Sequence, residues 1–133
     1  MAQTLTARVW REQPQRYRML GNRCLETGEI CFPPRLVAAG NLQATFTEHL
    51  LGQKGRVLTY TVIRVPPSPF SDLAPYALAV IETEDGARLT AQVTDCGLDE
   101  VKIGLEVRFE FRRLYEENSA SVIYYGYKAV PAR

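Results

Sequence analysis

The chain has 133 residues, a formal net charge of +1 at pH 7 and three cysteines without paired spacing. This length suits one ordinary domain, or one small domain with an appendage, and allows a buried core without covalent cross-links. The odd cysteine count argues against a secreted disulfide framework. The chain shows neither an apolar signal sequence nor a run of about eighteen apolar residues. We therefore expect a soluble, cytoplasmic protein without a membrane partner.

The charge is unevenly distributed along the chain. Residues 1–35 hold six arginines and three glutamates, whereas the remainder holds ten basic and twelve acidic residues. Arginine favours bidentate recognition of phosphate or carboxylate, although a solvated helix face accounts for the same residues. The small overall excess argues against a nucleic-acid partner.

Residues 1–20 form the first predicted segment, an N-terminal helical appendage. Its pattern predicts one or two short helical turns interrupted at Pro14, with Thr4 or Thr6 as the cap. Trp10 and Tyr17 lie seven positions apart and are expected to share one face. That face either docks on a partner or packs on the protein's own body, and both alternatives remain open.

Residues 21–41 read as a degenerate, rubredoxin-like zinc ribbon. Cys24 stands where a zinc knuckle begins, but Thr27 occupies the second ligand position. A structural zinc needs four ligands, usually from two Cys-x-x-Cys turns, and no second pair follows. Cys31, His49 and Cys96 lack knuckle spacing, so we expect no bound metal and reduced, partly buried thiols.

Residues 42–133 carry the pattern of a mainly β domain. Residues 42–51 are compatible with a strand or a short helix, which periodicity alone does not separate. Alternation, proline and turn signals then predict a helical turn at residues 98–101 and five strands, at residues 55–65, 76–83, 87–94, 105–115 and 120–130. A long first strand and a helical connector before the fourth suit a closed five-stranded OB-fold barrel.

Three groups of motifs occur in order along this chain. The first is Gly-Asn-Arg-Cys at residues 21–24 with Phe-Pro-Pro-Arg at residues 32–35; the second is residues 55–62; the third combines residues 76–82 and 103–107. Their order and spacing resemble the acyl-CoA-associated family built from a zinc ribbon and an OB-fold. The resemblance covers residues 16–131 and departs from the family at the ribbon, where Thr27 and residues 38–40 replace the expected thiols.

The resemblance implies a non-catalytic accessory subunit of a thiolase-fold enzyme, such as a thiolase, a hydroxymethylglutaryl-CoA synthase, an acyltransferase or a thiolase-like aldolase. The small subunit would help to form its partner's acyl-CoA channel, with the coenzyme A thioester shared between the two. Without zinc, packing of Leu25, Ile30, Phe32 and Val37, within the chain or against the partner, is expected to hold the ribbon.

Coenzyme A presents phosphates and a long pantetheine arm. The residues below are candidates to bind one of these two parts or to contact the partner subunit. Arg23 and Arg35 are candidates for the phosphates, while Phe32, Pro33 and Pro34 form a rigid apolar edge. Phe70 and Tyr76 flank the proline-rich loop and are candidates to cover the pantetheine arm. Purely structural roles for Arg35 and for this loop account for the same residues.

An enzymatic role for the chain alone is not expected. It contains one histidine and no triad-like Ser, His and Asp spacing, phosphate-binding glycine loop or paired-carboxylate motif. Two other functions remain as alternatives: an OB-fold protein that binds single-stranded nucleic acid through aromatic residues and arginines, and a zinc-dependent structural module.

Overall fold

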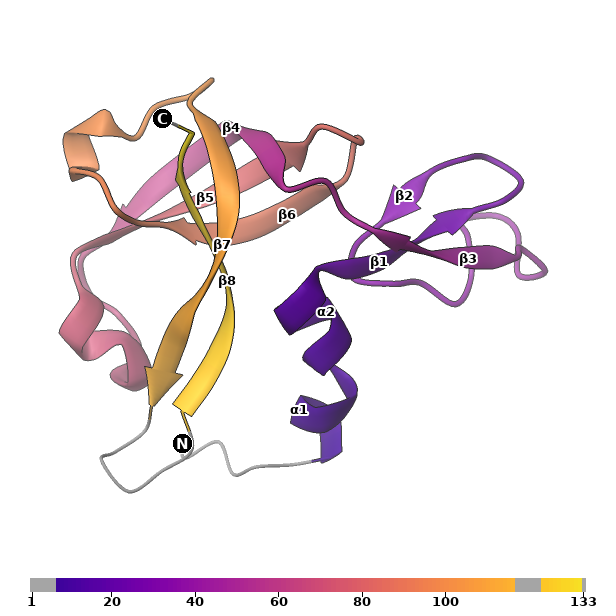
Figure 1. Ribbon diagram of the computed structural model, residues 1–133, viewed down its shortest axis with the longest axis horizontal. Helices are drawn as coiled ribbons and strands as arrows, with labels where there is room; N and C mark the ends of the chain where they lie inside the picture. The colour runs from indigo at the N-terminus through magenta and orange to yellow at the C-terminus, as the bar shows by residue number, and fades with distance from the viewer. Residues whose placement is uncertain (1–6, 117–122, 133) are drawn as a thin grey trace.

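The computed structural model describes residues 7–116 and 123–132. Figure 1 shows a barrel at one end of the molecule, a small ribbon sheet at the other and two short helices beside the junction. The barrel closes in the order β4-β5-β6-β8-β7. Its strands are β4 (Lys54–Ile63), β5 (Tyr76–Thr83), β6 (Arg88–Val93), β7 (Glu106–Glu116) and β8 (Ile123–Pro131). The expected mainly β fold with a five-stranded OB barrel is therefore confirmed.

Alternation of side chains explains why the barrel strands form where they do. Along β5 every second residue is buried, including Ala77, Ala79 and Ile81, so one face of the strand lines the core. Gly86 makes the β5–β6 turn with a φ of 91°, a conformation that glycine adopts without steric cost. The proline-rich loop forms the 3₁₀ helix η1 (Ser68–Leu73), and η2 (Leu98–Glu100) precedes β7.

The ribbon is a separate antiparallel sheet in the order β2-β1-β3. Its strands are β1 (Leu20–Cys24), β2 (Ile30–Cys31) and β3 (Phe46–Leu50). The segment that periodicity left open is thus a strand, and it pairs with β1 and not with the barrel. The expected division of the chain into residues 1–20, 21–41 and 42–133 stays a prediction, but β3 lies with the ribbon.

Two short helices precede the ribbon, α1 (Ala7–Arg11) and α2 (Gln13–Arg18). Pro14 lies in the first turn of α2. A backbone N–H at this position has no acceptor within the helix, so the helix loses no hydrogen bond to proline. Thr4 and Thr6, the expected caps, lie outside the described residues. Met19 then takes a left-handed conformation and enters the barrel core. Met19 therefore anchors the end of the N-terminal segment to the core.

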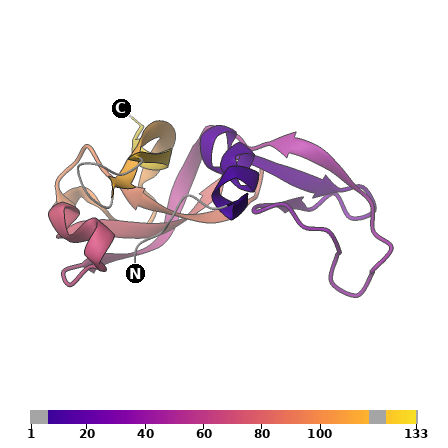
Figure 2. The same ribbon diagram turned by 90° about the horizontal axis from the view of Figure 1, so that it is seen from below.

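One continuous core connects the base of the ribbon with the barrel. Ile30 and Phe32 pack against the barrel core, as expected for the ribbon. Leu25 and Val37 are 59% and 48% exposed, because Leu25 lies in the first turn of the ribbon and Val37 lies in the bend before the second. Packing of these two residues against a partner stays a prediction. Figure 2, turned by 90°, shows the ribbon extending away from the barrel. No helix in the described ranges is long and apolar enough to cross a membrane.

Candidate functional site

A groove of about 650 Å³ runs along one face of the barrel. Its lining comes from β5, β6 and the β7–β8 hairpin, together with α2, η1 and the loop after β2. OB barrels bind elongated ligands on the face of their second and third strands, between the loop after the first strand and the hairpin of the last two. The groove occupies this position, and we call it the barrel groove.

The barrel groove opens where β6 and β8 separate. These two strands pair in parallel at Val93 and Ala129. Residues 88–92 of β6 lie on one side of the separation, and Gly126 and Tyr127 of β8 lie on the other. Along that edge of β6, no strand of the described chain pairs with residues 88–92. The groove therefore offers a strand edge as well as side chains to a ligand.

Four of the residues expected from the sequence meet in this groove. Phe32 and Pro33 reach it from the ribbon, Phe70 reaches it from η1, and Tyr76 reaches it from the start of β5. The ring of Phe32 lies edge-on to Tyr127 at 5.8 Å between centroids, and the rings of Phe70 and Tyr76 are 6.1 Å apart. The tertiary structure thus brings two distant motifs together around one apolar surface.

The arginines of the groove differ from those expected. Arg23 and Arg35 do not belong to its lining, whereas Arg16 and Arg88 do. Arg16 donates to Glu12 at 2.8 Å and Arg88 donates to Glu82 at 3.1 Å, which orients both guanidinium groups. In β6 the exposed Arg88 precedes the buried Leu89, and Ala91 is buried as well. This alternation of exposed and buried residues is the signal in the sequence that could have placed Arg88 on the outer face of the strand.

Asn22 holds the loop that supplies Phe32 and Pro33. Its side-chain amide donates to the carbonyl of Arg35 at 2.7 Å and accepts from the Arg35 N–H at 3.2 Å. Asn22 is buried, so these two bonds satisfy the amide and fix the backbone at the end of the loop. Pro34 and the Arg35 side chain are exposed, outside the groove. Their binding roles stay predictions.

The chemistry of the lining suits binding. The described residues that line the groove include no carboxylate, cysteine, serine or histidine. Burial raises the pKa of Tyr127 to about 12, and the opposing effect of Arg16 is smaller. Tyr127 therefore remains a neutral phenol at physiological pH. The groove combines apolar rings, a strand edge and two cations.

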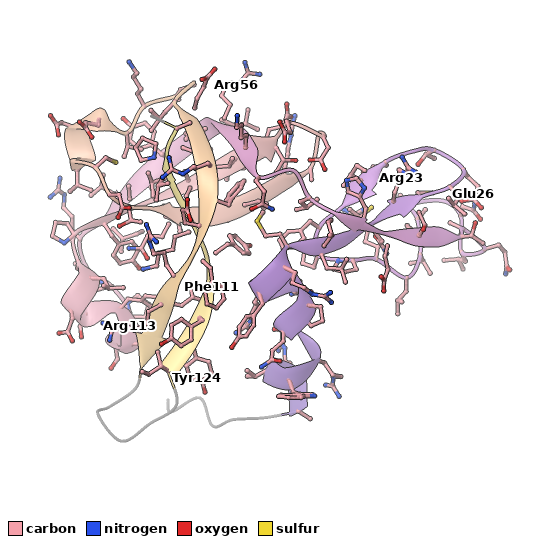
Figure 3. The ribbon with its side chains drawn as sticks, in the orientation of Figure 1. Arg23, Glu26, Arg56, Phe111, Arg113 and Tyr124 are labelled. Carbon is pink, nitrogen blue, oxygen red and sulfur yellow. The ribbon has the colours of Figure 1, made fainter. Side chains whose placement is uncertain are left out.

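A second surface presents exposed aromatic rings beside the helices. Tyr17 of α2 lies edge-on to Phe111 of β7 at 5.2 Å, and Phe111 stacks on Tyr125 of β8 at 5.4 Å. We call these three residues the aromatic strip. Figure 3 shows Phe111 on the β7–β8 hairpin of the barrel, whereas Glu26 lies at the far end of the ribbon. Trp10 of α1 is 70% exposed. Tyr17, for which docking on a partner and packing on the protein's own body were both open, thus contacts Phe111 of the barrel and remains 44% exposed.

The donor set of the ribbon does not suit the zinc that this type of ribbon usually holds. Its two turns present one thiol, Cys24, together with Thr27, Ala38 and Asn41. Within residues 7–116 and 123–132, no three His, Cys, Asp or Glu side chains group closely enough to hold a metal ion. A structural zinc requires four ligands. The absence of zinc from this protein stays a prediction, and the residues present support it.

Comparison with known proteins locates the chain among its relatives. The family described as the C-terminal OB-fold domain of ChsH2 matches residues 48–112. A DUF35 domain-containing scaffold protein of Methanothermobacter thermautotrophicus is 43% identical over 129 residues, which cover 96% of this chain and 97% of the relative. Proteins with the same description from Methanocaldococcus jannaschii and Pyrococcus furiosus are 42% and 37% identical, covering 96% and 94% of this chain and 91% of each relative.

A solved structure described as the Ltp2-ChsH2(DUF35) aldolase contains a chain of the same fold. The TM-score is 0.68 at 23% identity, and the match covers 100% of this chain and 99% of the other. At this identity the likeness concerns the fold. The relatives share sequence over almost their whole length, and they confirm the family resemblance inferred from the motifs. This chain belongs to the family of DUF35 domain-containing scaffold proteins.

Proposed function

We propose that this chain is a non-catalytic accessory subunit that binds a thiolase-fold enzyme and contributes the barrel groove to the acyl-CoA channel of that enzyme. The observation that carries the proposal is the convergence of Phe32 and Pro33 with Phe70 and Tyr76 in one groove that also presents Arg16 and Arg88. The description of the relatives as scaffold proteins and the aldolase named for the structural neighbour support this role.

The groove matches the chemistry of coenzyme A part by part. The pantetheine arm is narrow and partly apolar, and aromatic rings offer it contact area at low conformational cost. Its two amides match the edge of β6 that faces β8, because residues 88–92 pair with β5 on their other edge and β8 joins this edge at Val93. The phosphates require cations, and Arg16 and Arg88 provide forked donors.

The Arg88→Gln variant tests the channel. We expect the KM of the partner enzyme for its acyl-CoA to rise about tenfold in the complex, because a hydrogen bond to a charged group is lost. The matched control is Arg56→Gln, since Arg56 is exposed at another end of the barrel, as Figure 3 shows. Equal KM values for the two variants, with complex formation intact, would contradict a role of the groove in binding acyl-CoA.

The aromatic strip and Trp10 are the surface that we assign to the partner subunit. Exposed aromatic residues are frequent anchors of protein interfaces, and Phe111 is 52% exposed although it contacts two other rings. Tyr17, Phe111 and Tyr125 are held in one arrangement by these ring contacts. Less side-chain entropy is therefore lost on association.

The Phe111→Ala variant tests this docking surface. The dissociation constant of the complex is expected to rise at least about tenfold, as for a central interface anchor. Tyr60→Ala is the matched control, because Tyr60 is a comparably exposed aromatic residue on β4. Isothermal titration with the purified partner measures both. An unchanged affinity for Phe111→Ala would remove the strip from the interface, and a salt-dependent shift of an oligonucleotide would favour nucleic-acid binding instead.

A further inference from the structure

The ribbon keeps the two tight turns of a metal-binding ribbon although most of the ligands are absent. In the first turn the Gly28 N–H donates to the carbonyl of Cys24 at 2.8 Å. In the second turn Ala38 and Asn41 exchange two backbone hydrogen bonds, at 3.2 and 3.1 Å. Gly28 and Gly40 have φ angles of 76° and 74°, which favour glycine. The backbone of both turns is therefore preserved without the usual thiols.

Side-chain oxygens act within each turn at two of the positions that lack thiols. The Thr27 hydroxyl accepts from the Glu29 N–H at 3.3 Å, and the Asn41 side-chain oxygen accepts from the Gln43 N–H at 3.0 Å. Threonine and asparagine commonly stabilise turns by accepting from the backbone two residues further on. Each turn thus closes through its own side chain and needs no metal to order it.

A carboxylate connects the first turn to the end of the second loop. Both oxygens of Glu26 accept from the Thr45 N–H at 3.2 Å, and the Thr45 hydroxyl donates to Glu26 Oε1 at 2.9 Å. The Leu25 N–H in turn donates to the Thr45 carbonyl at 3.0 Å. The buried Cys24 thiol donates to Glu26 Oε2 at 3.4 Å. Figure 3 shows Glu26 at the end of the ribbon that lies away from the barrel.

We infer that the Glu26–Thr45 hydrogen bonds replace the metal as the cross-link between the first turn and the loop that carries the second turn, so that this ribbon folds and stays folded without zinc. In a zinc ribbon the ion joins the two turns, and its binding free energy is folding free energy. Here the first turn is joined instead to Thr45, at the end of the second loop, through a carboxylate, a hydroxyl and two backbone amides. The hydrogen bond from Thr45 also lowers the pKa of Glu26, as expected for a carboxylate that accepts bonds in its charged form.

The metal content of the full-length protein tests this inference first. We expect protein purified without added metal to contain no stoichiometric zinc, and its melting temperature to be the same with and without a strong chelator. One zinc per chain, or a melting temperature that falls in the chelator, would overturn the inference. The outcome does not depend on the proposed function, because neither the partner enzyme nor acyl-CoA is present.

Glu26→Ala tests the cross-link itself, with Glu29→Ala in the same turn as the matched control. Hydrogen exchange of the Thr45 and Leu25 amides is expected to accelerate roughly tenfold in Glu26→Ala and to stay unchanged in the control, because the lost acceptor is charged. Glu26→Gln keeps one acceptor oxygen, so its amide exchange rates are expected to lie between those of Glu26→Ala and those of the control. Equal exchange in all three variants would refute the cross-link. Thr45→Val, which loses the hydroxyl alone, provides a milder variant should Glu26→Ala unfold the ribbon.

Restoring the thiols tests whether the turns keep ligand geometry. The triple variant Thr27→Cys, Ala38→Cys and Asn41→Cys joins Cys24 in two Cys-x-x-Cys turns. We expect it to bind one zinc per chain and, with cobalt as a spectroscopic probe, to give the absorption of tetrahedral thiolate coordination. In the zinc-bound triple variant, Glu26→Ala should no longer accelerate exchange. Failure of the folded variant to bind zinc would contradict the inference.

Discussion

Asp85 is the residue that ties the ribbon to the barrel. It lies in the β5–β6 turn and accepts from His49 Nε2 of β3 at 2.6 Å and from the Gly52 N–H at 3.1 Å. The Thr83 hydroxyl donates to the other carboxylate oxygen of Asp85 and also accepts from the Ala87 N–H. One carboxylate therefore joins β3, the linker into the barrel and the turn in which it lies.

The stability that Asp85 contributes depends on pH. Burial alone raises the pKa of Asp85, but hydrogen bonds from Thr83, His49 and the Gly52 amide outweigh burial and hold the pKa below its ordinary value of 3.8. The contribution is therefore present above pH 3.8 and is lost as the pH falls through the folded-state pKa. We expect Asp85→Asn to lower the free energy of unfolding by about 2 kcal/mol at pH 7.

Urea denaturation at pH 7 and at pH 3 measures this contribution. The difference in free energy of unfolding between the unmodified protein and Asp85→Asn should shrink at the lower pH. Protonation of Asp85 removes the same charge that the substitution removes. Asp99→Asn is a suitable control, since Asp99 is exposed in η2. A difference that stays constant between the two pH values would show that Asp85 acts without its charge.

At the scale of elements, the ribbon depends on a close approach between β1 and β2. A Cβ added to Gly21 would collide with the backbone carbonyl oxygen of Cys31, which cannot move aside without breaking the strand pairing. The small residue therefore allows the two strands to pair while Phe32 continues towards the barrel groove. The position of one groove wall depends in this way on a glycine in the neighbouring strand.

Gly21→Ala is expected to lower the free energy of unfolding by about 2 to 3 kcal/mol, because overpacking against backbone forces the strands apart. The matched control is Gly97→Ala, where the added Cβ would meet a side-chain oxygen of Asp99, which can rotate away. Chemical denaturation gives both values. Similar stabilities for the two variants would mean that the β1–β2 pairing adapts to the extra methyl group.

At the scale of the whole molecule, ribbon and barrel share one hydrophobic core. Met19 and Leu51, which lie side by side where β1 begins and β3 ends, belong to the same buried cluster as Val57 and Ile81 of the barrel. Ile30 and Phe32 pack against this cluster as well. The base of the ribbon is therefore an extension of the barrel core, even though the two sheets are separate.

Unfolding of the chain is expected to be a single cooperative transition, because the shared core has to be disrupted for either part to open. Amide signals of Asn22 in the ribbon and of Ile81 in the barrel, followed by NMR during a urea titration, should give the same midpoint. The core-preserving variant Tyr60→Ala should leave the two midpoints together. A ribbon signal lost at lower urea would show that the ribbon unfolds as an independent unit.

Much of the barrel was predictable because its signals are local. The expected strand at residues 76–83 coincides with β5, since alternation and turn residues act between close neighbours in the chain. Along β7, Val107 and Phe109 are buried and Arg108 is half-buried, as alternation predicts, whereas Phe111, on the same side of the alternation as Phe109, is 52% exposed. The expected last strand began at residue 120, and its residues 120–122 lie outside the described part of the chain.

The ribbon and the groove were less predictable because they depend on contacts between distant segments. Periodicity did not separate strand from helix at residues 42–51, and pairing with β1 decided it. Leu25 and Val37 were expected to pack within the chain or against a partner, and the described part of the chain leaves both exposed. Arg16 and Arg88 were not distinguished from other surface arginines, since their shared groove exists only in the folded chain.

The sequence by itself determined the barrel, the family resemblance and the loss of the zinc thiols, because each of these is written in local pattern or residue type. Phe32, Pro33, Phe70 and Tyr76 were also identified as candidates from the sequence. Only the tertiary structure brought these four residues into one groove and paired Glu26 with Thr45 across the ribbon. Chain folding sets such distances, and no spacing along a sequence encodes them directly.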